Sequence, residues 1–226
     1  MFCQQIVAAL VVLVMLAVVA PARAQSKATA ATGVAKEGTF LAVHGLLDTA
    51  VRGSQLDGTH FFSDGDQLLL LPYVHQGNGL GVAIGFRGQR GAFEAGYERS
   101  RHRGSFLGVP GDATFNAINL DGKVSFAARH RVQPYGVLGL ALTWLTVDDG
   151  AVSRSSTGNA SFSGPAINTG AGVSVFLNHR VAVEIGYAYR VLWFTRASGV
   201  NGGPEDLDEY IGGRMGHVVV GTIVIF

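Results

Sequence analysis

Six ionisable residues fall on one face of the strands that the sequence predicts, because alternate positions along a strand share a face. They are Glu94, Glu98, Asp121, Lys123, Glu184 and Arg190. Carboxylates and cations gathered on one face can pair as a buried network of salt bridges, or they can line a narrow path for ions. Since an isolated buried ion is very costly, we expect the paired network and keep the ion path as the alternative.

A second group has the residue types of an acyl-transfer triad. Glu98, Ser100 and His102 share one face of a single predicted strand. Residues two apart on a strand lie about 6.6 Å from each other, beyond hydrogen-bond reach unless a bulge or a neighbouring strand intervenes. We therefore expect no catalytic residues. No metal and no cofactor is expected either, because the remaining histidines lack metal-ligand spacing; they are His44, His60, His75, His130, His179 and His217.

The elements that must position these groups are β-strands. Between 181 and 193, Val183 and Ile185 belong to a face of large apolar residues, whereas Glu184 and Gly186 belong to a face of small or charged ones. This period of two indicates a strand. The same division recurs at 80–86, 118–126 and 167–175. A face of small residues suits the cramped interior of a barrel better than the surface of a soluble sheet.

The composition is unusual for a water-soluble protein. Charged residues make up 15% of the 226 residues, and 32 residues are glycine; ordinary soluble domains contain about 25% charged residues. After the N-terminal segment, no run approaches the roughly 20 apolar residues that a membrane-spanning helix needs. A chain that spans a bilayer with strands must close its sheet into a barrel. The net charge of +1 gives no support for nucleic-acid binding.

Eight alternating segments can be counted, and their connections alternate between short and long. The segments are 38–47, 67–86, 91–103, 113–127, 135–147, 165–177, 181–194 and 215–226. Short connections are expected at 86–91, 128–134 and 178–180, and longer polar ones at 48–66, 104–112, 148–164 and 195–214. Short periplasmic turns and long outer loops are typical of bacterial outer-membrane barrels. The sequence therefore predicts an all-β, eight-stranded antiparallel up-and-down transmembrane β-barrel.

Aromatic residues gather at both ends of these segments. Phe86, Phe126, Phe226 and Tyr135 are expected to form a periplasmic girdle, and Tyr97, Trp144 and Trp193 an outer one.

The N-terminal segment has the pattern of a secretory signal peptide. An apolar stretch at 6–20 is followed by Ala22-Arg23-Ala24, the small-x-small pattern of a cleavage site. We expect a signal peptide at 1–24, a flexible lead-in at 25–37 and the barrel at 38–226. The alternative is an uncleaved anchor, although the stretch is short for a bilayer-spanning helix. The only cysteine, Cys3, lies in this segment, so the mature chain contains no disulfide.

Three stretches resemble the small eight-stranded outer-membrane barrels of the OmpA-like or OmpX-like family. They are 134–141 (PYGVLGLA), 183–190 (VEIGYAYR) and the terminal 216–226 (GHVVVGTIVIF), which ends on an aromatic residue. The resemblance covers about 38–226. It implies that the barrel-assembly machinery recognises the last strand through Phe226, and that the peptidoglycan-binding domain of longer relatives is absent. Some small barrels deacylate lipid A with a His-x-Ser pair, but Ser100-Arg101-His102 has the reverse order.

The expected role is structural or surface-interacting, in the bacterial outer membrane, with exposed loops meeting an unidentified extracellular ligand. Arg99, Arg101 and Arg103 are expected at the outer interface, where guanidinium groups bind lipopolysaccharide phosphates. The partners are therefore outer-membrane lipid and lipopolysaccharide. A narrow porin-like channel is the first alternative. A lipid A-modifying enzyme and a soluble lipocalin-like barrel are the others.

Overall fold

The structure is a computed structural model that describes residues 35–53, 56–58, 61–64, 67–148, 159–198 and 205–226. The predicted signal peptide at 1–24 lies outside the described residues, as does the lead-in up to residue 34. Within the described part, every regular element is a β-strand. No helix there is long and apolar enough to cross a bilayer.

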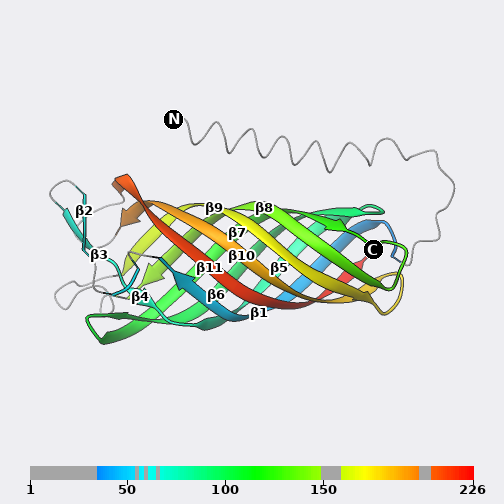
Figure 1. The fold of residues 1–226 in the computed structure, drawn as a ribbon, viewed down its shortest axis with the longest axis horizontal. Coiled ribbons are helices and arrows are strands. Elements are labelled where there is room, and N and C mark those ends of the chain that lie inside the picture. The colour runs from blue at the N-terminus through cyan, green and yellow to red at the C-terminus, as the bar shows by residue number, and fades with distance from the viewer. Residues whose placement is uncertain (1–34, 54–55, 59–60, 65–66, 149–158, 199–204) are drawn as a thin grey trace.

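Eight long strands form a closed antiparallel ring, which confirms the predicted fold (Figure 1). Each strand pairs with its neighbours in chain order, and β1 also pairs with β11, from Phe40 opposite Ile225 to Arg52 opposite Arg214. The strands are β1 (Gly38–Arg52), β5 (Gly77–Arg87), β6 (Gly91–Phe106), β7 (Val109–Ser125), β8 (Val132–Val147), β9 (Ala160–Phe176), β10 (Val181–Ser198) and β11 (Glu205–Ile225).

Three short strands lie at the end of the barrel opposite the C-terminus (Figure 1). They are β2 (Phe61–Asp64), β3 (Gln67–Leu70) and β4 (Tyr73–Val74). The predicted second strand at 67–86 is therefore wrong at its start, because β3 pairs with β2 in a separate hairpin and the barrel strand β5 begins only at Gly77. Pro72 separates the two parts, and a proline cannot donate a ladder hydrogen bond.

The predicted long connection at 104–112 is also wrong. β6 and β7 remain paired up to Phe106 opposite Val109. Only Leu107 and Gly108 join them, with φ of 48° and 77°. Two consecutive positive φ values are typical of the two-residue turns that match the twist of a hairpin. The predicted loops at 148–164 and 195–214 are shorter as well, because β9 begins at Ala160 and β11 at Glu205.

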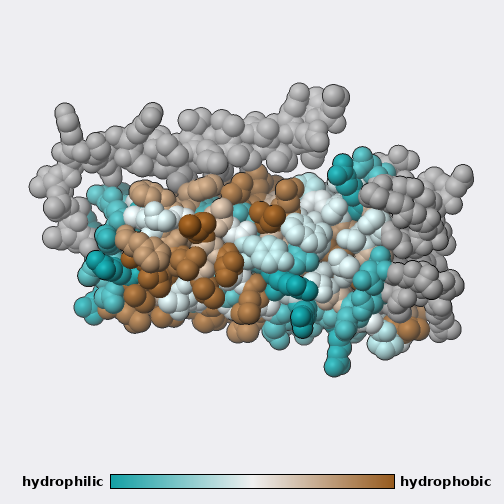
Figure 2. Space-filling view, turned by 180° about the vertical axis from the view of Figure 1, so that it is seen from behind, coloured by the Kyte–Doolittle hydropathy of each residue, from teal (hydrophilic) through white to brown (hydrophobic). Residues whose placement is uncertain are grey.

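Large apolar side chains point outward along the wall, as the period of two predicts. Val82 is 51% exposed, Leu120 42% and Ile185 58%. In Figure 2, hydrophobic residues gather over the half of the visible wall nearer the C-terminus, and hydrophilic residues over the other half. An exposed apolar surface of this extent is unfavourable in water and matches the hydrocarbon layer of a bilayer.

The interior of the barrel has apolar clusters above and below a polar layer. Near the short turns, the lower cluster consists of Phe40, Ala42, Ala83, Ala92, Phe176, Ala182, Ile223 and Ile225. Toward the other end, the upper cluster includes the large side chains Phe115, Leu145, Phe162, Leu192, Phe194, Ile211 and Met215. The charged residues described below lie between these two clusters.

Candidate functional site in the barrel lumen

The lower half of the polar layer is organised around Lys123. Its Nζ atom lies 3.0 Å from Oε2 of Glu184 and 3.5 Å from Oε2 of Glu94. Ser174 donates a hydrogen bond to Glu184, and Lys123 also lies 4.7 Å from the ring centroid of Tyr135. Glu184 is only 1% exposed. A buried carboxylate with an ammonium and a hydroxyl as donors is the arrangement that makes charge burial tolerable.

The upper half is organised around Arg190. Its Nη2 donates to Oε2 of Glu98 at 2.9 Å and to Oδ1 of Asn119 at 3.0 Å. Its Nε donates to Oδ1 of Asn168 at 2.6 Å, and the amide of Asn168 in turn donates to Asp121 at 2.9 Å. The guanidinium therefore joins residues of β6, β7 and β9 across the lumen. All six residues of the predicted charge network lie in this interior layer.

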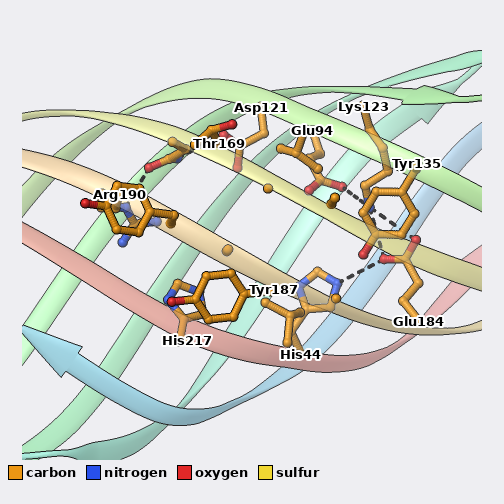
Figure 3. A pocket seen from close by; sticks show the side chains of 18 of the residues that line it. His44, Glu94, Asp121, Lys123, Tyr135, Thr169, Glu184, Tyr187, Arg190 and His217 are labelled. Carbon is orange, nitrogen blue, oxygen red and sulfur yellow. Dashed lines mark hydrogen bonds and ion pairs between the residues drawn. The ribbon is translucent and has the colours of Figure 1, made fainter.

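A small cavity separates the two halves of the layer, and its volume is about 70 Å³. In Figure 3, His44 and His217 point toward it from β1 and β11, and Glu94 of β6 and Asp121 of β7 lie on the opposite side. Glu184 of β10 lies beside His44. Nε2 of His44 lies 3.7 Å from Oε2 of Glu184. Both ring nitrogens of His217 are buried and have no hydrogen-bond partner among the described residues. The space can hold a few water molecules, which buried polar groups of this kind commonly bind.

The interior contains polar residues that sequence reasoning did not assign to it. Arg87 lies near the lower cluster, where it donates to Gln133 and its guanidinium carbon lies 4.9 Å from the ring centroid of Phe176. Tyr135 is also interior and only 6% exposed, so its predicted place in the periplasmic girdle is wrong. The signal was present in the sequence: Gln133, Tyr135 and Gly139 share one parity once β8 begins at Val132.

Ser100 and His102 are closer than their sequence separation predicts. The hydroxyl of Ser100 lies 2.8 Å from Nε2 of His102, so the expectation that they lie beyond hydrogen-bond reach is wrong. Nδ1 of His102 lies 3.0 Å from the backbone carbonyl of His75 and must donate to it, which leaves Nε2 as the acceptor in the neutral ring. The third residue of the supposed triad, Glu98, pairs with Arg190 instead. Ser100 is 1% exposed and does not line the lumen cavity.

The predicted outer residues lie on the exterior wall. Arg99, Arg101 and Arg103 are all exposed on β6, above the outward-facing Tyr97, which donates to Asn116 at 2.7 Å. At the opposite end, Phe226 is exposed, and its backbone nitrogen donates to the carbonyl of Thr39 on β1. Among the described residues, no group of three or more potential ligands is placed to hold a metal ion.

Solved structures of several small barrels are similar to this chain. The neisserial surface protein NspA is 18% identical, with 84% of this chain and all of NspA covered and a TM-score of 0.54. OprG of Pseudomonas aeruginosa is 15% identical over 85% of this chain and 98% of its own, with a TM-score of 0.52. The outer-membrane protein AlkL is 13% identical over 89% of this chain and 96% of its own, with a TM-score of 0.51. No protein-family model and no curated protein matches the sequence.

The closed ring of eight strands, the outward apolar surface and these similarities show that the chain has the fold of the small bacterial outer-membrane β-barrel proteins. The resemblance to OmpA-like and OmpX-like barrels is thereby confirmed for the fold.

Proposed function

We propose that the protein is a non-conducting structural barrel of the outer membrane that presents its extracellular end to other molecules and carries out no catalysis. The observation that supports the proposal best is the order of layers in the lumen: an ion-paired layer lies between two apolar clusters. An ion that entered from either side would have to leave water and pass tightly packed aromatic side chains. The cost of such desolvation opposes conduction.

The same layers are evidence against the alternative function, a porin-like channel. Lys123 and Arg190 are occupied by carboxylates and amides from strands on several sides of the lumen. A conducting path would require these bonds to break, leaving buried charges without partners. The described cavity holds only about 70 Å³. The polar layer therefore acts as a plug that fixes the positions of the surrounding strands.

Planar-bilayer recordings test this proposal. We expect no steady single-channel current from the wild-type protein or from Lys123→Met, because the apolar clusters remain in both. A variant that opens the upper cluster, Phe115→Ala with Phe162→Ala, serves as the positive comparison and should raise ion leakage. A stable, reproducible current from the wild-type protein would overturn the proposal and favour the channel.

The extracellular end is proposed as the interaction surface. The β2–β3 hairpin lies there, at the end of the barrel opposite the C-terminus (Figure 1). Replacing 61–70 by a short Gly-Ser linker should abolish adhesion of expressing cells to an extracellular target while leaving the barrel folded. Unchanged adhesion across a panel of matrix and serum proteins would contradict this assignment.

Two membrane partners complete the proposal. Arg99, Arg101 and Arg103 bind lipopolysaccharide phosphates at the outer interface, since exposed guanidinium groups pair bidentately with phosphate. Phe226 directly follows the last strand, β11, and its exposed aromatic ring supports a role as the residue that the barrel-assembly machinery recognises. Replacing the three arginines with Gln should lower the lipopolysaccharide retained during purification, and unaltered retention would count against the contact.

A further inference from the structure

Two more arginines lie close to the Arg99–Arg101–Arg103 series on the outside of the barrel. Arg52 on β1 and Arg214 on β11 are direct cross-strand partners, and both side chains are exposed. Side chains at opposed positions lie about 5 Å apart at Cβ, and like charges placed there repel. We call the five residues Arg52, Arg99, Arg101, Arg103 and Arg214 the basic rim.

The rim has few counter-charges of its own. Within the part of the chain that the structure describes, none of the five arginines forms an ion pair. Three exposed carboxylates lie near them, Asp48 on β1, Asp57 just after β1 and Asp112 opposite Arg103, so the formal charge is 5 − 3 = +2. Arg196, by contrast, is an exposed arginine that forms an ion pair with a carboxylate, Asp206 of the next strand. Among the described residues, no carboxylate is paired with these five guanidinium groups, which can therefore bind an anion.

The rim is continuous around one side of the barrel. Arg214, Arg52 and the β6 arginines lie on β11, β1 and β6, and β5 with its extension β4 occupies the position between β1 and β6. His75, just after β4, is exposed and lies within 3.3 Å of Ser105 of β6, with Tyr73 packed edge-to-face against it at 4.7 Å. Three strand spacings separate β11 from β6, or about 14 Å along the wall.

The height of the rim indicates an anion that belongs to the membrane. Arg99 is paired with Leu80 of β5, which is 68% exposed at the upper edge of the apolar wall. Arg101 is paired with Asn78. On β5, the next outward-facing residue beyond Leu80 toward the extracellular end is therefore already polar. A soluble polyanion would contact the loops above, whereas a lipid phosphate lies at the boundary between apolar and polar wall.

We propose that the basic rim is a single site for a lipid headgroup that carries two phosphate groups, one bound by Arg99, Arg101 and Arg103 and the other by Arg52 and Arg214. This inference rests on the lipopolysaccharide contact proposed above and extends it to β1 and β11. The second phosphate neutralises the opposed Arg52–Arg214 pair, which explains why two like charges are tolerated there. The bound lipid also covers the seam where the first and last barrel strands meet.

Native mass spectrometry of the folded protein in detergent tests the site, with diphosphoryl and monophosphoryl lipid A as the two probes. The wild-type protein should retain the diphosphoryl form with a preference of about tenfold, because the second phosphate adds charge-assisted hydrogen bonds. Arg52→Gln with Arg214→Gln should reduce this preference to near unity and leave monophosphoryl binding unchanged. Arg129→Gln with Arg131→Gln, two exposed arginines at the short-turn end, is the matched control and should change neither.

The outcomes separate the two proposals. A preference that survives in the Arg52/Arg214 variant overturns the extended site. If the Arg99/Arg101/Arg103 variant also retains both lipids, the original contact is overturned as well. Displacement of the lipid by an equal concentration of soluble pyrophosphate would assign the rim to a soluble anion and contradict the lipid. Heat-modifiability on gels reports whether each variant folds. If the double variant does not fold, Arg52→Gln and Arg214→Gln are tested singly, and each should lower the preference for diphosphoryl lipid A.

Discussion

Lys123 and Glu184 form an ion pair that crosses the barrel lumen. The two residues lie 61 positions apart on β7 and β10, strands that are not neighbours in the ring, yet Nζ approaches Oε2 to 3.0 Å. The pair therefore joins opposite sides of the wall directly, with Glu94 of β6 as a further acceptor at 3.5 Å. Such a contact holds β6, β7 and β10 together across the lumen, because breaking it would leave buried charges without partners.

Replacing Lys123 with Met should destabilise the barrel. Glu184 and Glu94 would remain buried without their cation, and breaking one side of a buried pair costs about 3–5 kcal/mol. The midpoint of urea unfolding, followed by heat-modifiability, measures the effect. Lys36→Met, at an exposed position, is the control and should be neutral. The double variant Lys123→Met with Glu184→Gln should recover part of the loss, and a double variant no better than the single one would contradict the pairing.

Replacing Gly139 with Ala should block folding. Gly139 faces the lumen opposite Asp121, and a Cβ atom there would overlap the Asp121 carboxylate and the backbone of Leu120. Asp121 would be forced from Asn168, which also binds Arg190. The control lies on the same strand: at Gly136 the nearest atom to an added Cβ is 3.8 Å away. Recovery of folded protein after refolding into lipid vesicles should fall severely for Gly139→Ala and stay unchanged for Gly136→Ala. Equal yields would be evidence against the close contact.

Replacing Ser100 with Ala should leave the structure of lipid A unchanged and should lower the stability of the barrel slightly. The hydrogen bond to His102 contributes about 1 kcal/mol, as is usual for a buried neutral pair. Because Ser100 is buried and lies outside the lumen cavity, no substrate reaches it. Mass spectrometry of lipid A from cells with the wild-type or variant protein should give identical spectra. Loss of an acyl chain only in wild-type cells would show that the pair is catalytic.

Replacing Phe226 with Ala should reduce assembly without reducing stability. The side chain is exposed and takes no part in the lower cluster, so its removal should change the free energy of unfolding less than the loss of a lumen side chain does. Outer-membrane yield in cells should fall because the proposed recognition residue is lost. Ile225→Ala is the control. The side chain of Ile225 is buried in the lower cluster, so its loss should lower the free energy of unfolding in vitro. Normal yield of the Phe226 variant would contradict the assembly role.

The period-two pattern was sufficient to predict the ring, because each strand must separate lipid-facing from lumen-facing residues. The positions at which the strands begin and end were harder to predict from the sequence. Nothing local distinguishes Leu107-Gly108 from a longer loop, since the leucine adopts a positive φ that its residue type disfavours. Tyr135 was misplaced because its position at a strand end was weighed above its parity, which is opposite to that of the outward-facing Leu138 and Leu142.

The sequence predicted which charged side chains lie in the lumen, but it could not predict which of them pair with each other. Parity placed Lys123, Glu184 and Arg190 inside, but which charges meet depends on strand tilt and stagger around the ring. The Ser100–His102 bond depends in addition on a side-chain rotation that is fixed by the backbone carbonyl of His75, which follows β4 and is distant in sequence.

The pairing of β1 with β11 sets the order in which this protein can be made. β1 is made early and β11 last, so one edge of β1 stays unpaired until the whole chain has been made. During that interval the exposed edge is a template for association with other chains. A chain without β11 would leave this edge of β1 unpaired and could not close the ring.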